Sequence, residues 1–236
     1  MGGVVAIEAA PYIVFTALLM FGLALHTSTP ELGLAISDFD TLHRFQTWDL
    51  GRDLSSQLHA RLQTFLAPQH WQELTFIAVC IGPGGFTGTR IGVATARTLA
   101  QQLDIPLLGV SALAAVAHYQ LARFDQASKC WETQQMATDI AVTMPAKRGA
   151  VYGAVYSWTN ETLRIKLADT VLPAADWELK QAHWSESLVR ASLASGAGLG
   201  ETTPSLLQLG YERWKAQQYT GWREVTPFYG QHPVTS

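Results

Sequence analysis

Glycine is concentrated in the stretch IGPGGFTGTR, which starts at Ile81 and leads into a run typical of a helix. A glycine-rich loop between a strand and a helix offers backbone amides to which phosphate groups bind in many enzymes. The spacing fits neither common phosphate motif. A P-loop requires a lysine directly after its last glycine, and no lysine occurs between Glu73 and Gln120. In the dinucleotide pattern, Thr87 stands at the position of the third glycine. Two interpretations remain open: a structural turn, or a contact for a ligand or a partner protein.

The histidines and cysteines form no pattern that predicts a metal site or a nucleophile. The seven histidines include no H-E-x-x-H motif and no pair at helical i, i+4 spacing, and two cysteines are too few for a disulfide framework. Cys80 lies in an apolar run and is expected to be a buried, inert cysteine. His118 has no helical partner and is expected on the surface or hydrogen-bonded in the core. We therefore predict no catalytic residue, no metal and no cofactor.

The composition describes a globular protein with few charges. The chain has 236 residues, a net charge of −3 and 15% charged residues, enough length to bury a core in one domain or two. No basic block occurs, so tight binding of nucleic acid by this chain alone is disfavoured. The low cysteine count favours a cytoplasmic location, and the sparse charge favours a surface that a partner covers.

The N-terminal residues are apolar but predict neither a membrane span nor a secretory signal. The run over 9–25 is shorter than the roughly 20 residues of a spanning helix, Pro11 interrupts it, and no basic segment precedes it. We expect a strand from about Phe21 and regard residues 1–19 as an extension of doubtful status. An over-long gene model, with Met20 as the natural start, is the alternative.

The apolar periodicity of the first half predicts the order β-β-β-α-β-α-β-α. The predicted strands and helices are 21–25, 32–36, 41–48, a helix over 53–66, a strand over 73–82, a helix over 89–102, and a strand and helix within 104–122. In the helix over 53–66 the apolar residues share one face, which predicts burial of that face. They are Leu54, Leu58, Leu62, Phe65 and Leu66.

The second half repeats the opening of the first, with a looser pattern. Strands are expected over 137–143, 150–156 and 162–167, helices over 175–182 and 203–216, and a further strand with a glycine turn over 193–199. Two halves that each open with three strands indicate duplicated α/β units. We assign 20–118 to an N-terminal subdomain and 119–236 to a C-terminal subdomain.

Small residues follow the glycine loop at helical spacing, at Gly88, Gly92, Ala94, Ala96 and Ala100. Small side chains let two helices approach closely, and a glycine inside a helix costs about 1 kcal/mol relative to alanine. Close packing must offset this cost. The pattern fits burial against the chain's own sheet and equally fits a helix face open to a partner.

The motifs around this loop resemble those of the TsaB (YeaZ) family. IGPGGFTGTRIGVATARTLAQQLDIPLLGVSALAA is similar to the family signature G-P-G-S-F-T-G-x-R-I-G, a helix and I-P-x-x-G-V-S-x-L, with Gly85 where serine is usual. LALHTSTPELGLAI is similar to L-x-L-D-T-S-T, MPAKRGAVYGAVY to D-A-R-R-G-E-V-Y, and VTPFYGQHP to P-x-Y-x-R-x-P. The resemblance covers about 21–233 and indicates a divergent member. The departures in the flanking motifs are His26, Pro145, Lys147, Ala150 and Gln231.

The resemblance implies an α/β fold of the actin-like, sugar-kinase-like (ASKHA) type, with two ribonuclease-H-like subdomains whose mixed sheets are flanked by helices. It also implies a non-catalytic relative of the threonylcarbamoyltransferase TsaD. The metal-binding histidines of TsaD, in H-x-x-x-H, align with Ala112 and Val116, neither of which can donate a lone pair. His26 occupies the place of the aspartate that serves magnesium in kinase-like folds. We interpret it as a loss of catalytic function, with a new role as the alternative.

The implied function is that of a scaffold. The chain would pair with TsaD and support threonylcarbamoyl transfer to adenosine next to the tRNA anticodon, with ATP-dependent TsaE in the larger complex and tRNA reached only through the complex. The predicted contact is a four-helix bundle of the helices over 53–66 and 89–102 with the same pair of the partner, beside the glycine loop. The expected interface residues are Gly82, Pro83, Gly84, Gly85, Phe86, Thr87, Gly88, Arg90, Gly92, Ala96, Leu58 and Leu62.

Three alternatives stay open at this stage. In these alternatives the chain would be an ATP-binding phosphotransferase, a glycopeptidase-like hydrolase of the same fold, or a plain homodimeric module. A self-dimer in the absence of TsaD also stays open. Whether a nucleotide binds at the boundary shared with TsaD is a separate question. No membrane association is expected.

Overall fold

The structure is a computed structural model, and it describes residues 20–127, 138–159, 162–184, 188–194, 198–228 and 230. The expected N-terminal extension over 1–19, the closing-motif Gln231 and the cysteine Cys130 lie outside the described residues. None of the helices in the described part of the chain is long and apolar enough to cross a membrane.

Five strands form the first sheet: β1 (Phe21–His26), β2 (Glu31–Ser37), β3 (His43–Asp49), β4 (Leu74–Cys80) and β5 (Leu107–Val110). Their order is β3-β2-β1-β4-β5. The first three strands are antiparallel neighbours, whereas β4 and β5 join them in parallel. In this register Leu23 faces Ile36 across β1 and β2, so the alternating apolar residues of both strands share one buried face.

Four strands form the second sheet: β6 (Thr138–Pro145), β7 (Ala150–Thr159), β8 (Thr162–Pro173) and β9 (Val189–Ser192). Their order is β8-β7-β6-β9, again with three antiparallel strands and a parallel fourth. This repetition confirms the predicted α/β fold with duplicated units, in which mixed sheets are flanked by helices. The strand expected over 193–199 is wrong: β9 ends at Ser192, where its pairing with β6 stops, and of the described glycines after it Gly198 lies in a bend and Gly200 begins a 3-10 helix.

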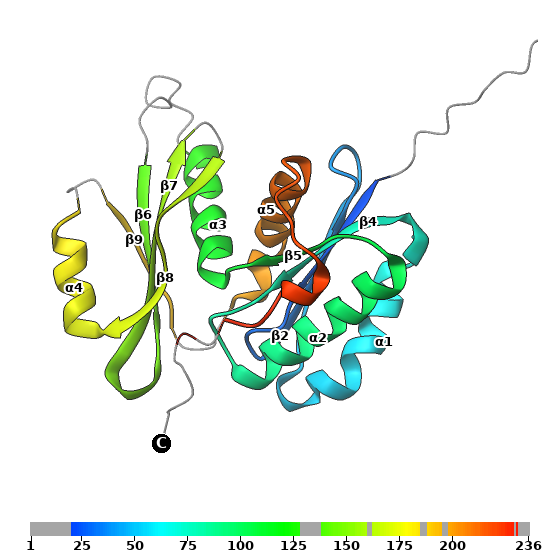
Figure 1. Cartoon of the computed structure of the whole chain (residues 1–236), viewed down its shortest axis with the longest axis horizontal. Helices are drawn as coiled ribbons and strands as arrows, with labels where there is room; N and C mark the ends of the chain where they lie inside the picture. Colours follow the sequence, from blue (N-terminus) through cyan, green and yellow to red (C-terminus); the bar gives the residue numbers. More distant parts are fainter. Residues whose placement is uncertain are drawn as a thin grey trace, which may run out of the picture.

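Five α-helices accompany the sheets: α1 (Leu54–Leu66), α2 (Phe86–Leu103), α3 (Ala112–Ala127), α4 (Ala174–Ala182) and α5 (Thr203–Lys215). Figure 1 shows the resulting layers: α1 and α2, the first sheet, α3 and α5, the second sheet, and α4. Helix α2 begins three residues earlier than predicted, directly after the glycine loop.

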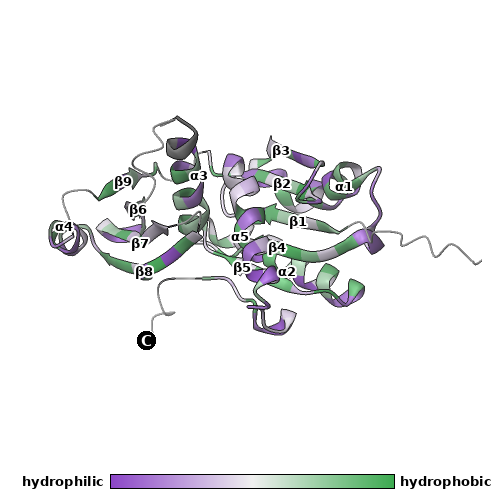
Figure 2. Ribbon diagram, turned by 90° about the horizontal axis from the view of Figure 1, so that it is seen from above, coloured by the Kyte–Doolittle hydropathy of each residue, from purple (hydrophilic) through white to green (hydrophobic). Residues whose placement is uncertain are grey.

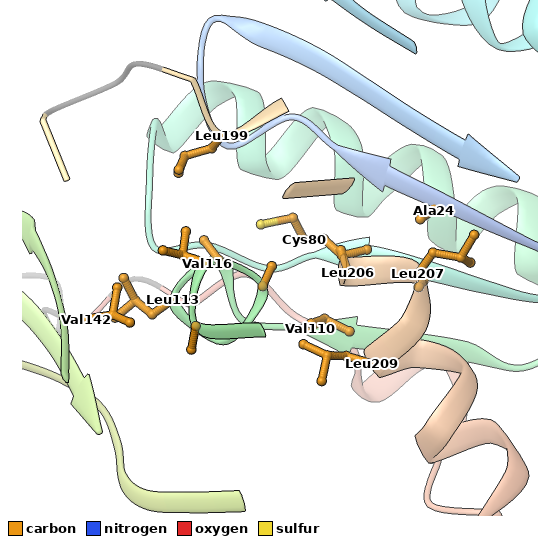
Figure 3. Packing of buried hydrophobic residues seen from close by; sticks show 14 of the residues in the cluster. Ala24, Cys80, Val110, Leu113, Val116, Val142, Leu199, Leu206, Leu207 and Leu209 are labelled. Atoms are coloured by element: carbon orange, nitrogen blue, oxygen red, sulfur yellow. The ribbon is translucent and has the colours of Figure 1, made fainter. Parts of the chain in front are cut away.

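The largest core cluster fills the layer between the sheets, and Figure 3 shows how its side chains meet there. It joins Ala24 and Cys80 of the first sheet, Leu113 of α3 and Leu206 of α5 to Val142 of the second sheet. A second cluster lies between the opposite face of the first sheet and helices α1 and α2. Figure 2 shows apolar (green) segments along the strands of both sheets.

The strands of the two sheets come from consecutive parts of the chain, but the helices that cover them do not divide at the predicted boundary. The predicted boundary after residue 118 falls inside α3, which packs on α5 as well as on β6 and β7. Helix α5 comes from the second half but packs on β1, β2, β4 and β5 of the first sheet. The reason is that one face of the first sheet is still apolar after α1 and α2 have covered the other, and α5 supplies part of its cover.

Candidate functional site

The glycine loop between β4 and α2 is fastened to the turn between β1 and β2. The amide of Gly85 donates to the carbonyl of Ser28 at 2.6 Å, and the hydroxyl of Thr27 donates to the carbonyl of Gly88 at 2.9 Å. The hydroxyl of Thr89 donates to that of Ser28 at 3.1 Å. The polar side chains of the turn therefore hold the loop, across 61 residues of sequence, as well as shaping their own turn.

Close approach of the two backbones explains most of the glycines. A Cβ atom on Gly84 would lie 2.2 Å from the carbonyl oxygen of Ser28, and one on Gly88 would lie 2.2 Å from that of Thr27. Gly82 has a φ of 97°, a conformation in which a side chain is strained. Gly85 differs, because its Cβ would meet only the Ser28 oxygen, at an ordinary 3.5 Å.

A cleft of about 790 Å³ opens beside this assembly, between the first sheet and the β6–β7 turn of the second. Its first wall is the Thr27–Pro30 turn with the glycine loop and the start of α2, and its opposite wall is formed by 144–147 and Tyr152. Arg52 and Lys147 add one positive charge to each wall. A cationic cleft beside a helix N-terminus attracts an anion.

The predicted interface residues divide into three groups in the structure. Gly84, Gly85, Phe86, Thr87 and Arg90 are exposed at the start of α2, and the guanidinium of Arg90 lies 5.0 Å from the centre of the Phe86 ring. This group is accessible to a partner. Gly82 and Pro83 are buried at the base of the loop and Gly88 is half-buried, so these three shape it from below.

The other four predicted interface residues are buried, which corrects the prediction that they contact a partner. Leu58, Leu62 and Ala96 are at most 2% exposed and belong to the core between the helices and the first sheet. Gly92 is buried against Thr27, whose hydroxyl oxygen would lie 2.0 Å from an added Cβ. Apart from the exposed Ala94, the small-residue stripe of α2 thus faces its own protein, because the sheet occupies the space that a partner was expected to fill.

Two histidines are buried with ring nitrogens that have no hydrogen-bond partner. Both ring nitrogens of His26 and Nδ1 of His118 lack a partner, and burial lowers the pKa of each ring to about 4. His118 packs edge-on against Trp158 with ring centres 5.3 Å apart. The expectation that His118 is exposed or hydrogen-bonded in the core is therefore wrong, because apolar surroundings supply no partner for Nδ1.

The remaining residues with possible chemistry are inert in this structure. Burial raises the pKa of the Cys80 thiol to about 11, although Ser28 donates a hydrogen bond to its sulfur, so the predicted buried cysteine is confirmed. Ala112 and Val116 lie in the core at the start of α3. The described residues contain no group of three or more metal-binding side chains.

Sequence reasoning missed the second wall of the cleft. Lys147 and Arg52 received no role as binding residues, and Tyr152 was not singled out. The available signal was the duplication itself: the β6–β7 turn occupies in the second sheet the place of the β1–β2 turn in the first. A repeated hairpin turn predicts that both turns border the space between the units.

Comparison with known proteins gives independent evidence on the family to which the chain belongs. The family model described as TsaD, tRNA N6-adenosine threonylcarbamoyltransferase, matches residues 62–205. The tRNA threonylcarbamoyladenosine biosynthesis protein TsaB of Bacillus subtilis (strain 168) is 34% identical over 160 residues, which are 66% of this chain and 63% of that protein. TsaB of Escherichia coli (strain K12) is 33% identical over 84 residues, 36% of this chain and 32% of that protein. The matches thus span less than two thirds of either relative.

A solved structure, YeaZ from Pseudomonas aeruginosa, has the same fold. It superposes with a TM-score of 0.69 at 22% identity, over 89% of this chain and 99% of that chain. A second structure, described as an uncharacterized protein with similarity to peptidase YEAZ from Pseudomonas aeruginosa, gives 0.66 at 23% identity, over 90% and 100%. At this level of identity the likeness concerns the fold.

Proposed function

The chain belongs to the TsaD family (tRNA N6-adenosine threonylcarbamoyltransferase) and is a relative of the TsaB (YeaZ) proteins, and from this membership we propose that it is a non-catalytic subunit of a tRNA threonylcarbamoyladenosine biosynthesis complex. Its partner in this proposal is the TsaD enzyme of the same cell, with TsaE and tRNA joining the larger complex. A cytoplasmic location follows from that role.

The observation that carries the proposal is the outer face of α1 and α2, two helices in contact. Arg90 is the residue with a fixed charge among the exposed side chains of these helices, and the rest are small or uncharged polar groups together with the aromatic ring of Phe86. The exposed residues are Ser55, Ser56, His59, Ala60, Gln63, Thr64, Phe86, Thr87, Arg90, Ala94, Thr98, Gln101 and Gln102. The cores of protein interfaces are depleted of charge, and small side chains permit close helix packing, so this face suits a helical partner.

The non-catalytic character is supported by the residues at the positions that matter in TsaD. The aligned metal-binding positions hold Ala112 and Val116, and both side chains are buried in the core. His26 stands in the place of a magnesium-binding aspartate, and its ring is enclosed. An enclosed imidazole is a poor ligand for a hard cation.

The pairing is tested with Ala94→Glu and Ala60→Glu, which put a charge on the outer face of each helix. Co-purification with TsaD should fall at least about 10-fold, because the charge would have to be desolvated at the interface. Ala175→Glu on the exposed face of α4 is the matched control and should pair normally. Normal pairing of both helix variants would overturn the proposal. Ala96→Glu is unsuitable, since it would disrupt the chain's own core.

A second function, binding of a phosphorylated ligand such as ATP, is favoured by one observation: the cleft between the duplicated turns carries Arg52 and Lys147 on opposite walls. Calorimetry of the isolated chain with ATP and magnesium distinguishes the two. Heat of binding that Lys147→Met abolishes would favour the nucleotide function, and turnover of ATP by the pure chain would contradict a non-catalytic role. Absence of heat leaves the scaffold as the function.

A further inference from the structure

A second and larger cleft, of about 1140 Å³, is lined by none of the loop glycines, and Ile81 is the residue of the glycine-rich stretch that reaches it. It opens between β8 of the second sheet and the last turn of α5, with the start of α3 at its base. Four lining residues with acidic or basic side chains come from α5 or β8: Arg164, Glu212, Arg213 and Lys215. A fifth charged residue, Asp169, lies deeper.

Asp169 is a carboxylate that the protein holds in place without a cation. The hydroxyl of Ser111 donates to its Oδ2 at 2.5 Å, and the hydroxyl of Tyr156 donates to its Oδ1 at 2.7 Å. Burial raises the pKa of this carboxyl, and no described cationic side chain forms an ion pair with it. Each carboxylate oxygen can accept about two hydrogen bonds, so both keep accepting capacity.

Arg213 lines the same cleft and carries the opposite charge. Its Nη1 donates to the carbonyl of Gly109 at 2.6 Å, and burial lowers the pKa of its guanidinium. No described carboxylate forms an ion pair with it, and the neighbouring Glu212 instead interacts with Lys215. A guanidinium has five N–H donors, so most of those of Arg213 remain available.

A half-buried carboxylate and a guanidinium at the exposed rim therefore line one cleft without pairing with each other. An uncompensated charge removed from water is costly, and proteins tend to retain such an arrangement where a ligand completes it. A simple anion would compensate only Arg213, and a simple cation only Asp169. A molecule that carries both charges compensates both.

We propose that this cleft binds a small zwitterion of the amino-acid class, with its ammonium group on Asp169 and its carboxylate on Arg213. The hydroxyls of Ser111 and Tyr156 orient the carboxylate of Asp169 toward this role. Apolar groups complete the cleft and are available to a ligand side chain. They include Leu163, Phe228 and Ile165, which is 69% exposed. This site is separate from the α1–α2 face and does not depend on the pairing proposed above.

The test is thermal unfolding of the full chain with each of the common amino acids at millimolar concentration, followed by calorimetry. At about 100 times the dissociation constant a ligand should raise the melting temperature by roughly 5–10 °C. For the amino acid that binds best, its N-acetyl derivative lacks the cation and its decarboxylated amine lacks the anion. Both analogues should bind at least about 10-fold more weakly.

Variants separate the site from general effects on folding. Asp169→Asn keeps the shape and removes the charge, and it should reduce affinity at least about 10-fold. Ala168→Trp fills the cleft from an exposed position, so it should abolish binding even if Asp169→Asn fails to fold. Lys166→Ala, on the same strand but outside the lining, should bind like the unaltered chain. No response to any amino acid, or equal binding of the amine or N-acetyl analogue, would overturn the proposal.

Discussion

Two adjacent glycines of the loop, Gly84 and Gly85, have opposite surroundings and should respond differently to serine. In Gly84→Ser the new Cβ would collide with the carbonyl of Ser28, so the free energy of unfolding should fall by about 1–3 kcal/mol. Gly85→Ser meets only ordinary contact and places a good N-cap residue before α2, so stability should stay equal or rise. Urea unfolding of both variants checks this, and equal losses would contradict the packing described here.

The buried histidines predict sensitivity to acid. Their pKa of about 4 in the folded protein lies below the ordinary 6.5, so the unfolded chain takes up protons first as the pH falls. The contribution of these neutral rings to the free energy of unfolding is fully present above about pH 6.5. It declines toward pH 4, by up to roughly 3 kcal/mol for each ring. Urea midpoints measured at pH 7.5, 6 and 5 should therefore decrease in this order.

Replacement of His26 isolates its share of this effect. His26→Leu removes a titrating ring whose nitrogens have no partners, so it should flatten the decline with pH and leave the stability at pH 7.5 equal or higher. His59→Gln, at an exposed position of α1, should leave the slope unchanged. An unaltered slope in His26→Leu would show that this ring is accessible to protons in the folded protein.

The sequence predicted single residues well where their environment was local. The apolar residues of α1 were expected to share one face, and all five are buried, although Leu58 and Leu62 among them had been assigned to a partner. The small residues of α2 fit two environments, because periodicity shows which residues share a face and not what that face meets. Ala96 and Gly92 were consequently assigned to a partner, while the sheet of the same chain covers them.

At the level of elements, α5 is held on the first sheet by stacked aromatic rings. Tyr211 lies 3.7 Å from Phe39 between ring centres, with planes 7° apart, and Phe76 and Trp214 continue the stack. Tyr211→Ala should lower the free energy of unfolding by about 2–4 kcal/mol, because stacking is lost together with burial. Tyr211→Phe keeps the ring and is the control, with an expected change below about 0.5 kcal/mol.

The prediction of elements was accurate in the first half and weaker in the second. Strands and helices up to residue 127 followed from alternation and helical period, with shifts of a few residues. The strand β9 has only four residues and is defined by pairing with β6, a contact over a long sequence separation. Short apolar patterns near residue 193 did not reveal that pairing. The cleft walls were missed for the same reason, since they meet only in three dimensions.

The molecule as a whole should unfold in one step. The central cluster contains residues of both sheets, with Phe76 and Ala24 on one side and Ile140 and Tyr156 on the other. Separate unfolding of either sheet would expose this shared core. Tryptophan fluorescence and far-ultraviolet circular dichroism should therefore give coincident urea transitions. Two resolved transitions would show that the sheets are independently stable.

The placement of α5 has a consequence for synthesis on the ribosome. All five strands of the first sheet have been translated by Val110, yet the helix that covers part of one face ends at Lys215. At about 5–20 residues per second the growing chain exposes that apolar face for roughly 5–20 seconds before its cover emerges. During this interval the nascent protein is a natural client for chaperones, and slow codons between the two points would lengthen its exposure to aggregation.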